Sequence, residues 1–134
     1  PGSPPAQPGD YPREFNVRQY TSSTNVPGTT GGFQSGPVGK YDTFMAKFNG
    51  KLTQIIQSTY LGGNADDWNP SIAVSGGNIY VAGNTSSDGF PNVAGGAQPA
   101  RGGGSQDAFE SLLTTSLRGS SGKGHPWLLL LLGN

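Results

Sequence analysis

Apolar and polar residues alternate along several short segments of this chain, which is the pattern of strands that bury one face of a sheet. In the segment 42–48 (DTFMAKF), Phe44, Ala46 and Phe48 fall on one face and the intervening residues on the other. The segment 14–20 (EFNVRQY) alternates in the same way. No stretch has the period of an amphipathic helix. The pattern therefore predicts an all-β fold.

Turn residues separate these segments at short intervals. Asn49-Gly50 is a strong signal for a β-hairpin, and Gly76-Gly77 marks a second tight turn. The four strands expected around these turns cover residues 42–48, 52–60, 71–74 and 78–82. We expect them to follow one another as a single antiparallel meander.

The chain also contains an internal repeat, with an offset of 64 residues that becomes 65 after one inserted residue. The matching pairs include Val17 with Val81, Thr21-Ser22-Ser23 with Thr85-Ser86-Ser87, Gln34 with Gln98, Asp42 with Asp107, Phe44 with Phe109, and Leu52 with Leu117. Chance agreement among Gly, Ser and Thr does not account for the repeated Asp-x-Phe. The repeat predicts that one structural unit occurs more than once.

The repeat divides the chain. Residues 1–13 contain five Pro and are expected to be an extended N-terminal extension. Residues 14–134 are expected to form one β domain. Within it, 14–38 is the end of one repeat, 39–98 a full repeat, and 99–134 the start of the next.

Composition narrows the function classes. The 134 residues include 23 Gly and 11 Pro, and eight basic residues balance eight acidic ones. A neutral chain is a poor candidate for binding nucleic acid through its phosphates. The absence of Cys excludes disulfides and thiolate metal sites. The longest apolar run, Trp127 to Leu132, is six residues, whereas a membrane-spanning helix needs about 20. It is expected to be a buried strand, and no membrane span is expected.

Three stretches together resemble a known family. They are DTFMAKFNGKL, QSTYLGGNADDWNPSIAV and GGNIYVAGNTSSDGFP, with GGFQ as a further short element. They resemble the SBBP-type β-propeller repeat of secreted or cell-surface bacterial and archaeal proteins, fully over 39–98 and partly over 15–38 and 99–134. The resemblance implies four-stranded antiparallel blades, an extracellular or cell-surface location, and a structural or binding role. The repeat defines no catalytic residues, so we do not expect an enzyme.

Counting blades gives a functional hypothesis. The chain is expected to hold one complete blade, about residues 40–83, with partial blades before and after it. A propeller typically has four to eight blades, so this chain cannot close a ring. It is expected to be a self-assembling subunit, a homo-oligomer or head-to-tail fibre whose blades are completed between chains. The alternatives are a fragment of a larger closed propeller, or a surface module that recognises glycan or protein through its blade-end loops. The candidate interface residues are Phe15, Val17, Trp127, Leu128, Leu130 and Leu132.

The remaining candidates are local. Asp66 and Asp67 offer oxygen ligands for Ca²⁺, although turn formation explains them better. Trp68, between Asp67 and Asn69, is expected to be exposed and to offer a ring for stacking on a glycan. Asn84 stands in the only Asn-x-Ser/Thr sequon, and four hydroxyl residues are further candidates for glycosylation. These four are Thr21, Ser22, Ser23 and Thr24. No other cofactor is expected.

Overall fold

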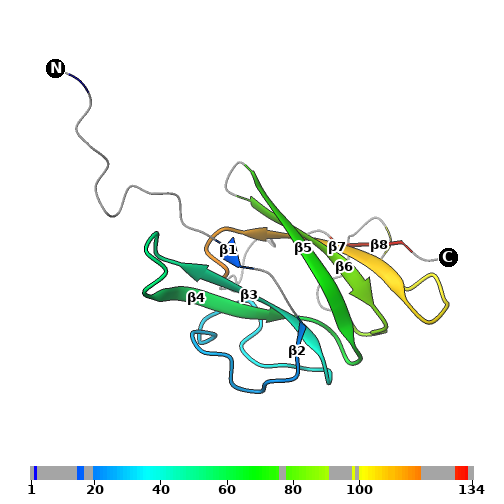
Figure 1. The fold of residues 1–134 in the computed structure, drawn as a ribbon. Coiled ribbons are helices and arrows are strands. Elements are labelled where there is room, and N and C mark those ends of the chain that lie inside the picture. The colour runs from blue at the N-terminus through cyan, green and yellow to red at the C-terminus, as the bar shows by residue number, and fades with distance from the viewer. Residues whose placement is uncertain are drawn as a thin grey trace.

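The computed structural model describes residues 20–75, 78–90 and 100–118, the short stretches 15–16 and 129–132, and the single residues Gly2 and Gln98. These residues form strands and no helix, and every strand pairing is antiparallel (Figure 1). The strands are β1 (Phe15–Asn16), β2 (Tyr20–Thr21), β3 (Asp42–Phe48), β4 (Ile55–Leu61), β5 (Asp67–Ser75), β6 (Asn78–Thr85), β7 (Asp107–Thr114) and β8 (Leu129–Leu132). The all-β prediction is confirmed for this part of the chain.

The first sheet is built around β3. On one side β3 pairs with β4, and on the other side it pairs with β1 near one end and β2 near the other. The predicted Asn49-Gly50 hairpin joins β3 to β4. Asn49 closes the turn, since its carbonyl oxygen accepts from Leu52 N at 3.0 Å and its side-chain Oδ1 accepts from Thr53 N at 2.9 Å.

The second sheet has the strand order β5-β6-β7-β8. Its first strand begins at Asp67, four residues before the start expected from the sequence, because the pairing with β6 continues past a bulge between Trp68 and Ser71. Asn69 lies in this bulge with φ +52°, a left-handed conformation that Asn tolerates better than most residues.

The division of the strands between sheets differs from the prediction. The strands between residues 42 and 82 do not form one four-stranded unit, because β4 and β5 belong to different sheets. The strands expected to begin another unit, β7 and β8, instead extend the sheet of β5 and β6. The physical reason is burial: pairing β6 with β7 places Ile79 opposite Leu113 and joins two apolar rows on one buried face.

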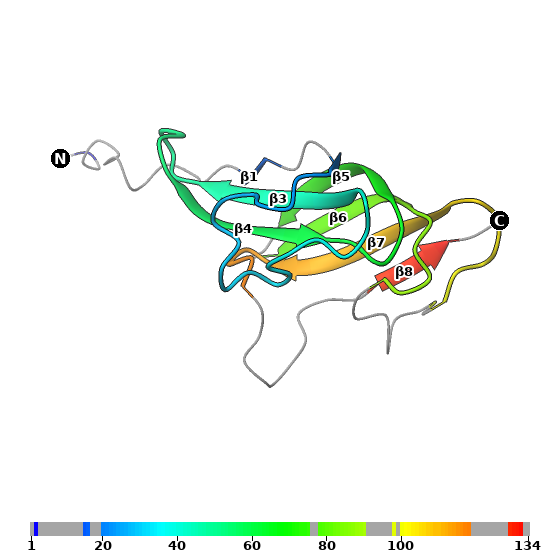
Figure 2. The same ribbon diagram turned by 90° about the horizontal axis from the view of Figure 1, so that it is seen from below.

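The core lies between the two sheets, which form adjacent layers (Figure 2). Met45 and Leu61 enter it from the first sheet, and Phe33 packs against it from the loop before β3. The other buried members are Ile79, Val81, Phe90, Phe109, Leu113 and Leu117. Alternate residues of β6 and β7 supply most of these side chains, as the period of a half-buried strand requires.

The structure repeats its geometry at the offset found in the sequence. Thr21 pairs with Asp42 in the first sheet as Thr85 pairs with Asp107 in the second. Leu52 and Leu117 both have φ +57°, and the backbone nitrogen of each donates to the carbonyl oxygen three residues before it. The internal repeat therefore corresponds to a repeated local structure.

Candidate functional site

Three aspartates open strands β3, β5 and β7, and all three are buried. Asp42, the first of them, holds the loop that leads into β3. Its Oδ2 accepts from Val38 N at 2.7 Å and from Gln34 Nε2 at 3.2 Å, and its Oδ1 accepts from Gly39 N at 3.2 Å. Burial raises the pKa of the Asp42 carboxyl above its usual value, and these hydrogen bonds oppose the rise.

Asp67 performs the same task where the chain crosses from the first sheet to the second. Its Oδ2 accepts from Gly63 N at 2.9 Å and from Ser87 Oγ at 3.1 Å. Burial raises the pKa of the Asp67 carboxyl to about 6. Gly62 lies between the two carboxylates: a Cβ added there would stand 2.7 Å from Oδ1 of Asp42 and 2.7 Å from Oδ2 of Asp67.

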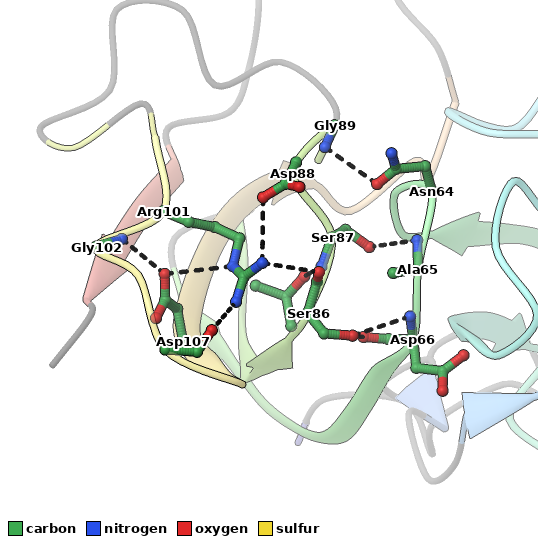
Figure 3. Close-up of polar contacts among 12 residues, drawn as sticks. Asn64, Ala65, Asp66, Ser86, Ser87, Asp88, Gly89, Arg101, Gly102 and Asp107 are labelled. Carbon is green, nitrogen blue, oxygen red and sulfur yellow. Dashed lines mark hydrogen bonds and ion pairs between the residues drawn. The ribbon is translucent and has the colours of Figure 1, made fainter.

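Asp107 is the third buried aspartate, and it is the one with a cationic partner. Its Oδ2 accepts from Gly102 N at 2.7 Å and lies 3.6 Å from Arg101 Nε. Figure 3 shows the Arg101 guanidinium between Asp107 on one side and Asp88 and Ser86 on the other. Its Nη1 lies 3.1 Å from both Asp88 Oδ1 and the Ser86 carbonyl oxygen.

The same chemistry recurs at all three positions. A buried carboxylate at the start of a strand accepts hydrogen bonds from backbone N–H groups of the preceding loop and so holds that loop in place. The arrangement fixes the loops between strands; among the described residues, no group of three or more His, Cys, Asp or Glu could hold a metal ion. The three buried aspartates and the loop N–H groups that they bind are structural elements of the fold.

A known protein family matches the part of the chain that contains Asp67. Residues 58–91 match the family described as the SBBP beta-propeller repeat. This segment is similar to an SBBP repeat. The match confirms the resemblance seen in the sequence. It begins within β4, includes Gly62-Gly63, β5 and β6, and ends at residue 91. The SBBP repeat thus spans the crossing between the two sheets. No curated protein matches the chain, and no solved structure does.

A substitution at Gly62 tests how tightly the backbone packs against the carboxylates of Asp42 and Asp67. Gly62→Ala should lower the free energy of unfolding by about 1 to 3 kcal/mol, because the new methyl group overlaps two buried carboxylates. Urea unfolding followed by tryptophan fluorescence measures the change. Gly36→Ala is the matched control, since nothing lies within 4 Å of a Cβ there, and it should change stability by less than about 0.5 kcal/mol. Equal losses in the two variants would contradict the crowding argument.

Asp67 predicts a dependence of stability on pH. Its folded pKa, about 6, lies above the ordinary value of 3.8, so the folded state binds the proton more tightly than the unfolded state. Its contribution is therefore complete below pH 3.8 and is lost as the pH rises through 6, by on the order of 3 kcal/mol. The side chain of the Asp67→Asn variant cannot ionise. The free energy of unfolding of the wild type minus that of the variant should therefore fall as the pH rises from 3.8 through 6.

The control for that measurement is Asp88→Asn, which removes one negative charge from an exposed position. Its stability relative to wild type should stay flat between pH 4 and 6. If Asp67→Asn gives an equally flat difference, folding does not raise the pKa of the Asp67 carboxyl.

The candidate calcium ligands Asp66 and Asp67 both take part in hydrogen bonds of the loop. Asp67 turns its carboxylate to Gly63 and Ser87, while the Asp66 backbone exchanges hydrogen bonds with Ser86. The neighbouring Asn64 accepts from Gly89 N at 3.2 Å. The hydrogen bond from Gly63 N to Asp67 lies within the turn, as the other interpretation of the loop expected, whereas the remaining contacts join the loop to residues 86–89.

The remaining candidates are scattered over the fold. Trp68, expected to be exposed, is partly buried in β5 and pairs with Asn84, which lies in β6 between two neighbouring strands. Thr21 ends β2, and the three residues after it are exposed. Their glycosylation stays a prediction. Val17, Trp127 and Leu128 lie outside the described residues. In the backbone pairing, Phe15 is opposite Lys47, Leu130 opposite Glu110 and Leu132 opposite Ala108. No helix in the described part is long and apolar enough to cross a membrane.

Sequence reasoning missed two residues of the site. Gln34 links the loop before β3 to both Asp42 and Gly62, since its Oε1 accepts from Gly62 N at 3.1 Å. Arg101 stood beside three glycines and gave no sign of a buried partner. Gln34 could have been found, because it belongs to the repeated GGFQ element and has Gln98 as its equivalent.

Proposed function

We propose that this chain is a structural module of a propeller-type repeat array outside the cell, which works by packing against neighbouring repeats and not by catalysis. The observation that carries the proposal is an incomplete sheet. In the second sheet, β6 pairs with β5 on one side and β7 on the other. In the first sheet, β1 and β2 occupy the place of β6, and no described strand pairs with them on the side away from β3.

The tail of the chain plays a different part from the one expected. The two C-terminal strands were expected to complete a blade of the next chain. Instead β7 pairs with β6 of the same chain from end to end, and β8 pairs with β7. The open position that a neighbour can fill is therefore the edge of β1 and β2, by addition of a strand. If separate copies fill it, the contact is heterologous and leads to a ring or a fibre.

A tandem of two full chains tests this function. If the repeats pack against each other, the tandem should unfold at a higher urea midpoint than the single chain, because each copy is stabilised by its neighbour. The tandem tests packing whether the natural neighbour is a second copy or a further repeat of a longer polypeptide. A tandem that unfolds at the midpoint of the single chain would contradict the proposal.

A recognition role is the second candidate, and one observation favours it. The outer face of the second sheet carries a shallow hollow of about 320 Å³ lined in part by Asn69, Ser71, Asn84 and Glu110. Its polar groups suit a glycan. Trp68 pairs with Asn84, so alternation along the strands places its ring on the same face. Binding to a glycan array that is lost in Trp68→Ala would support recognition, and unchanged binding would remove Trp68 from it.

A further inference from the structure

Three apolar residues of the second repeat have apolar equivalents 65 residues earlier in the first repeat. The two sets of side chains differ in how deeply they are buried. They are Phe109, Leu113 and Leu117 in the second sheet, and Phe44, Phe48 and Leu52 in the first. The first three are almost fully buried, whereas Phe44 and Phe48 are only partly buried and Leu52 is 53% exposed. Leu52 and Leu117 share the same φ and the same turn hydrogen bond, so local structure does not explain the difference.

The cover over Leu117 is supplied by the first sheet. Met45 belongs to the same buried cluster as Leu117, and Phe33 packs against that cluster. Two polar contacts accompany the packing: Phe33 N donates to the Leu117 carbonyl oxygen at 3.0 Å, and Lys47 Nζ donates to the Thr115 carbonyl oxygen at 2.9 Å. The first repeat thus packs against the second through Met45 and Lys47 of β3 and through Phe33 of its GGFQ loop.

The equivalent surface of the first sheet lacks such a cover among the described residues. There, no described group donates to the Leu52 carbonyl oxygen, and the Leu52 side chain is largely exposed. We infer that the face formed by Phe44, Phe48 and Leu52 is the docking surface for a preceding repeat of the same type, seated by a GGFQ-like loop on the turn 49–52. This inference rests on the proposed function and names its partner and contact.

The offset of 65 residues also indicates which side chain the preceding repeat must present at this docking surface. The preceding repeat must present an apolar side chain where the first repeat presents Met45. In a second copy of this chain that position is Glu110, which is exposed on the outer face of the second sheet. A second copy is therefore an imperfect partner, because docking would bury a carboxylate without a cation. The preferred partner is a repeat with Met, Leu or Val at this position.

The tandem of two full chains tests the inference with one substitution in two places. Leu52→Ala in the second copy should lower the urea midpoint by about 1 M, because that copy would receive the docked repeat. The same substitution in the first copy, whose face has no preceding repeat, should lower it far less. Glu110→Met in the first copy should raise the midpoint of the tandem, and Leu52→Ala in the second copy should cancel that gain.

The outcomes separate this inference from the proposed function. If the tandem is stabilised but Leu52→Ala has equal effects in both copies, the docking surface is wrong while the array function stands. If Glu110→Met leaves the midpoint unchanged, the stated chemistry of the partner is wrong. A tandem without any added stability overturns the proposed function itself.

Discussion

Leu117→Ala should lower the free energy of unfolding by about 2 to 5 kcal/mol, the range for removing a large aliphatic side chain from a packed core. The side chain is 1% exposed and lies among core residues from both sheets. The residue has φ +57°, a conformation that is strained for Ala as well as for Leu, so the backbone term largely cancels. The loss therefore measures packing between the sheets. Urea unfolding of the single chain gives the number.

The chain provides its own control for this prediction. Leu52 has the same φ and the same turn hydrogen bond, but its side chain is 53% exposed. In the single chain, Leu52→Ala should cost less than about 1 kcal/mol. If the two substitutions cost the same, the difference in burial between the two sheets does not exist in solution.

Arg101→Ala should lower the free energy of unfolding by on the order of 3 kcal/mol at neutral pH, because it leaves a buried carboxylate without its cation. The Asp107 side chain is 0% exposed, and the Arg101 side chain is only 15% exposed. After the substitution the carboxylate keeps its hydrogen bond from Gly102 N, which compensates for only part of the desolvation. Chemical unfolding at low ionic strength is the appropriate measurement.

Two further variants show whether charge is the cause. Asp88→Ala removes the other carboxylate bound to Arg101, but this side chain is 81% exposed, so the loss should stay below about 1 kcal/mol. Asp107→Asn in the Arg101→Ala background removes the unpaired charge and should restore part of the stability. If no stability returns, Arg101 acts through the packing of its aliphatic stem rather than through its charge.

The strands were predictable and their grouping into sheets was not. Alternation and turn residues located β3, β4 and β6 to within a few residues, because both signals are local. Gly62-Gly63 is the same dipeptide as Gly76-Gly77 of the predicted hairpin turn, yet it carries the chain from one sheet to the other. Sheet membership depends on which apolar faces are buried together, and the distant pairing of β6 with β7 decides that here.

The candidate site shows the same division. Asp42 and Asp107 are paired by the internal repeat, and both open a strand. Asp67 was grouped with Asp66 as a turn residue and candidate calcium ligand, but it is buried and bonded to Ser87, twenty residues away. Arg101 became recognisable only when the fold brought it to Asp107. Sequence indicates which residues are polar, whereas burial of a polar residue depends on the distant segment that covers it.

If Leu52 docks a preceding repeat, as we infer, the two left-handed leucines put stability and assembly in conflict at position 52 only. A side chain in this conformation costs about 1 kcal/mol relative to Gly, which adopts it freely. At Leu117 the buried side chain outweighs that cost within a single chain, while at Leu52 the single chain gains little in return. A library selected only for thermal stability of the isolated chain should therefore drift to Gly or Asn at position 52 and keep Leu at 117. Selection for a functioning array should retain both.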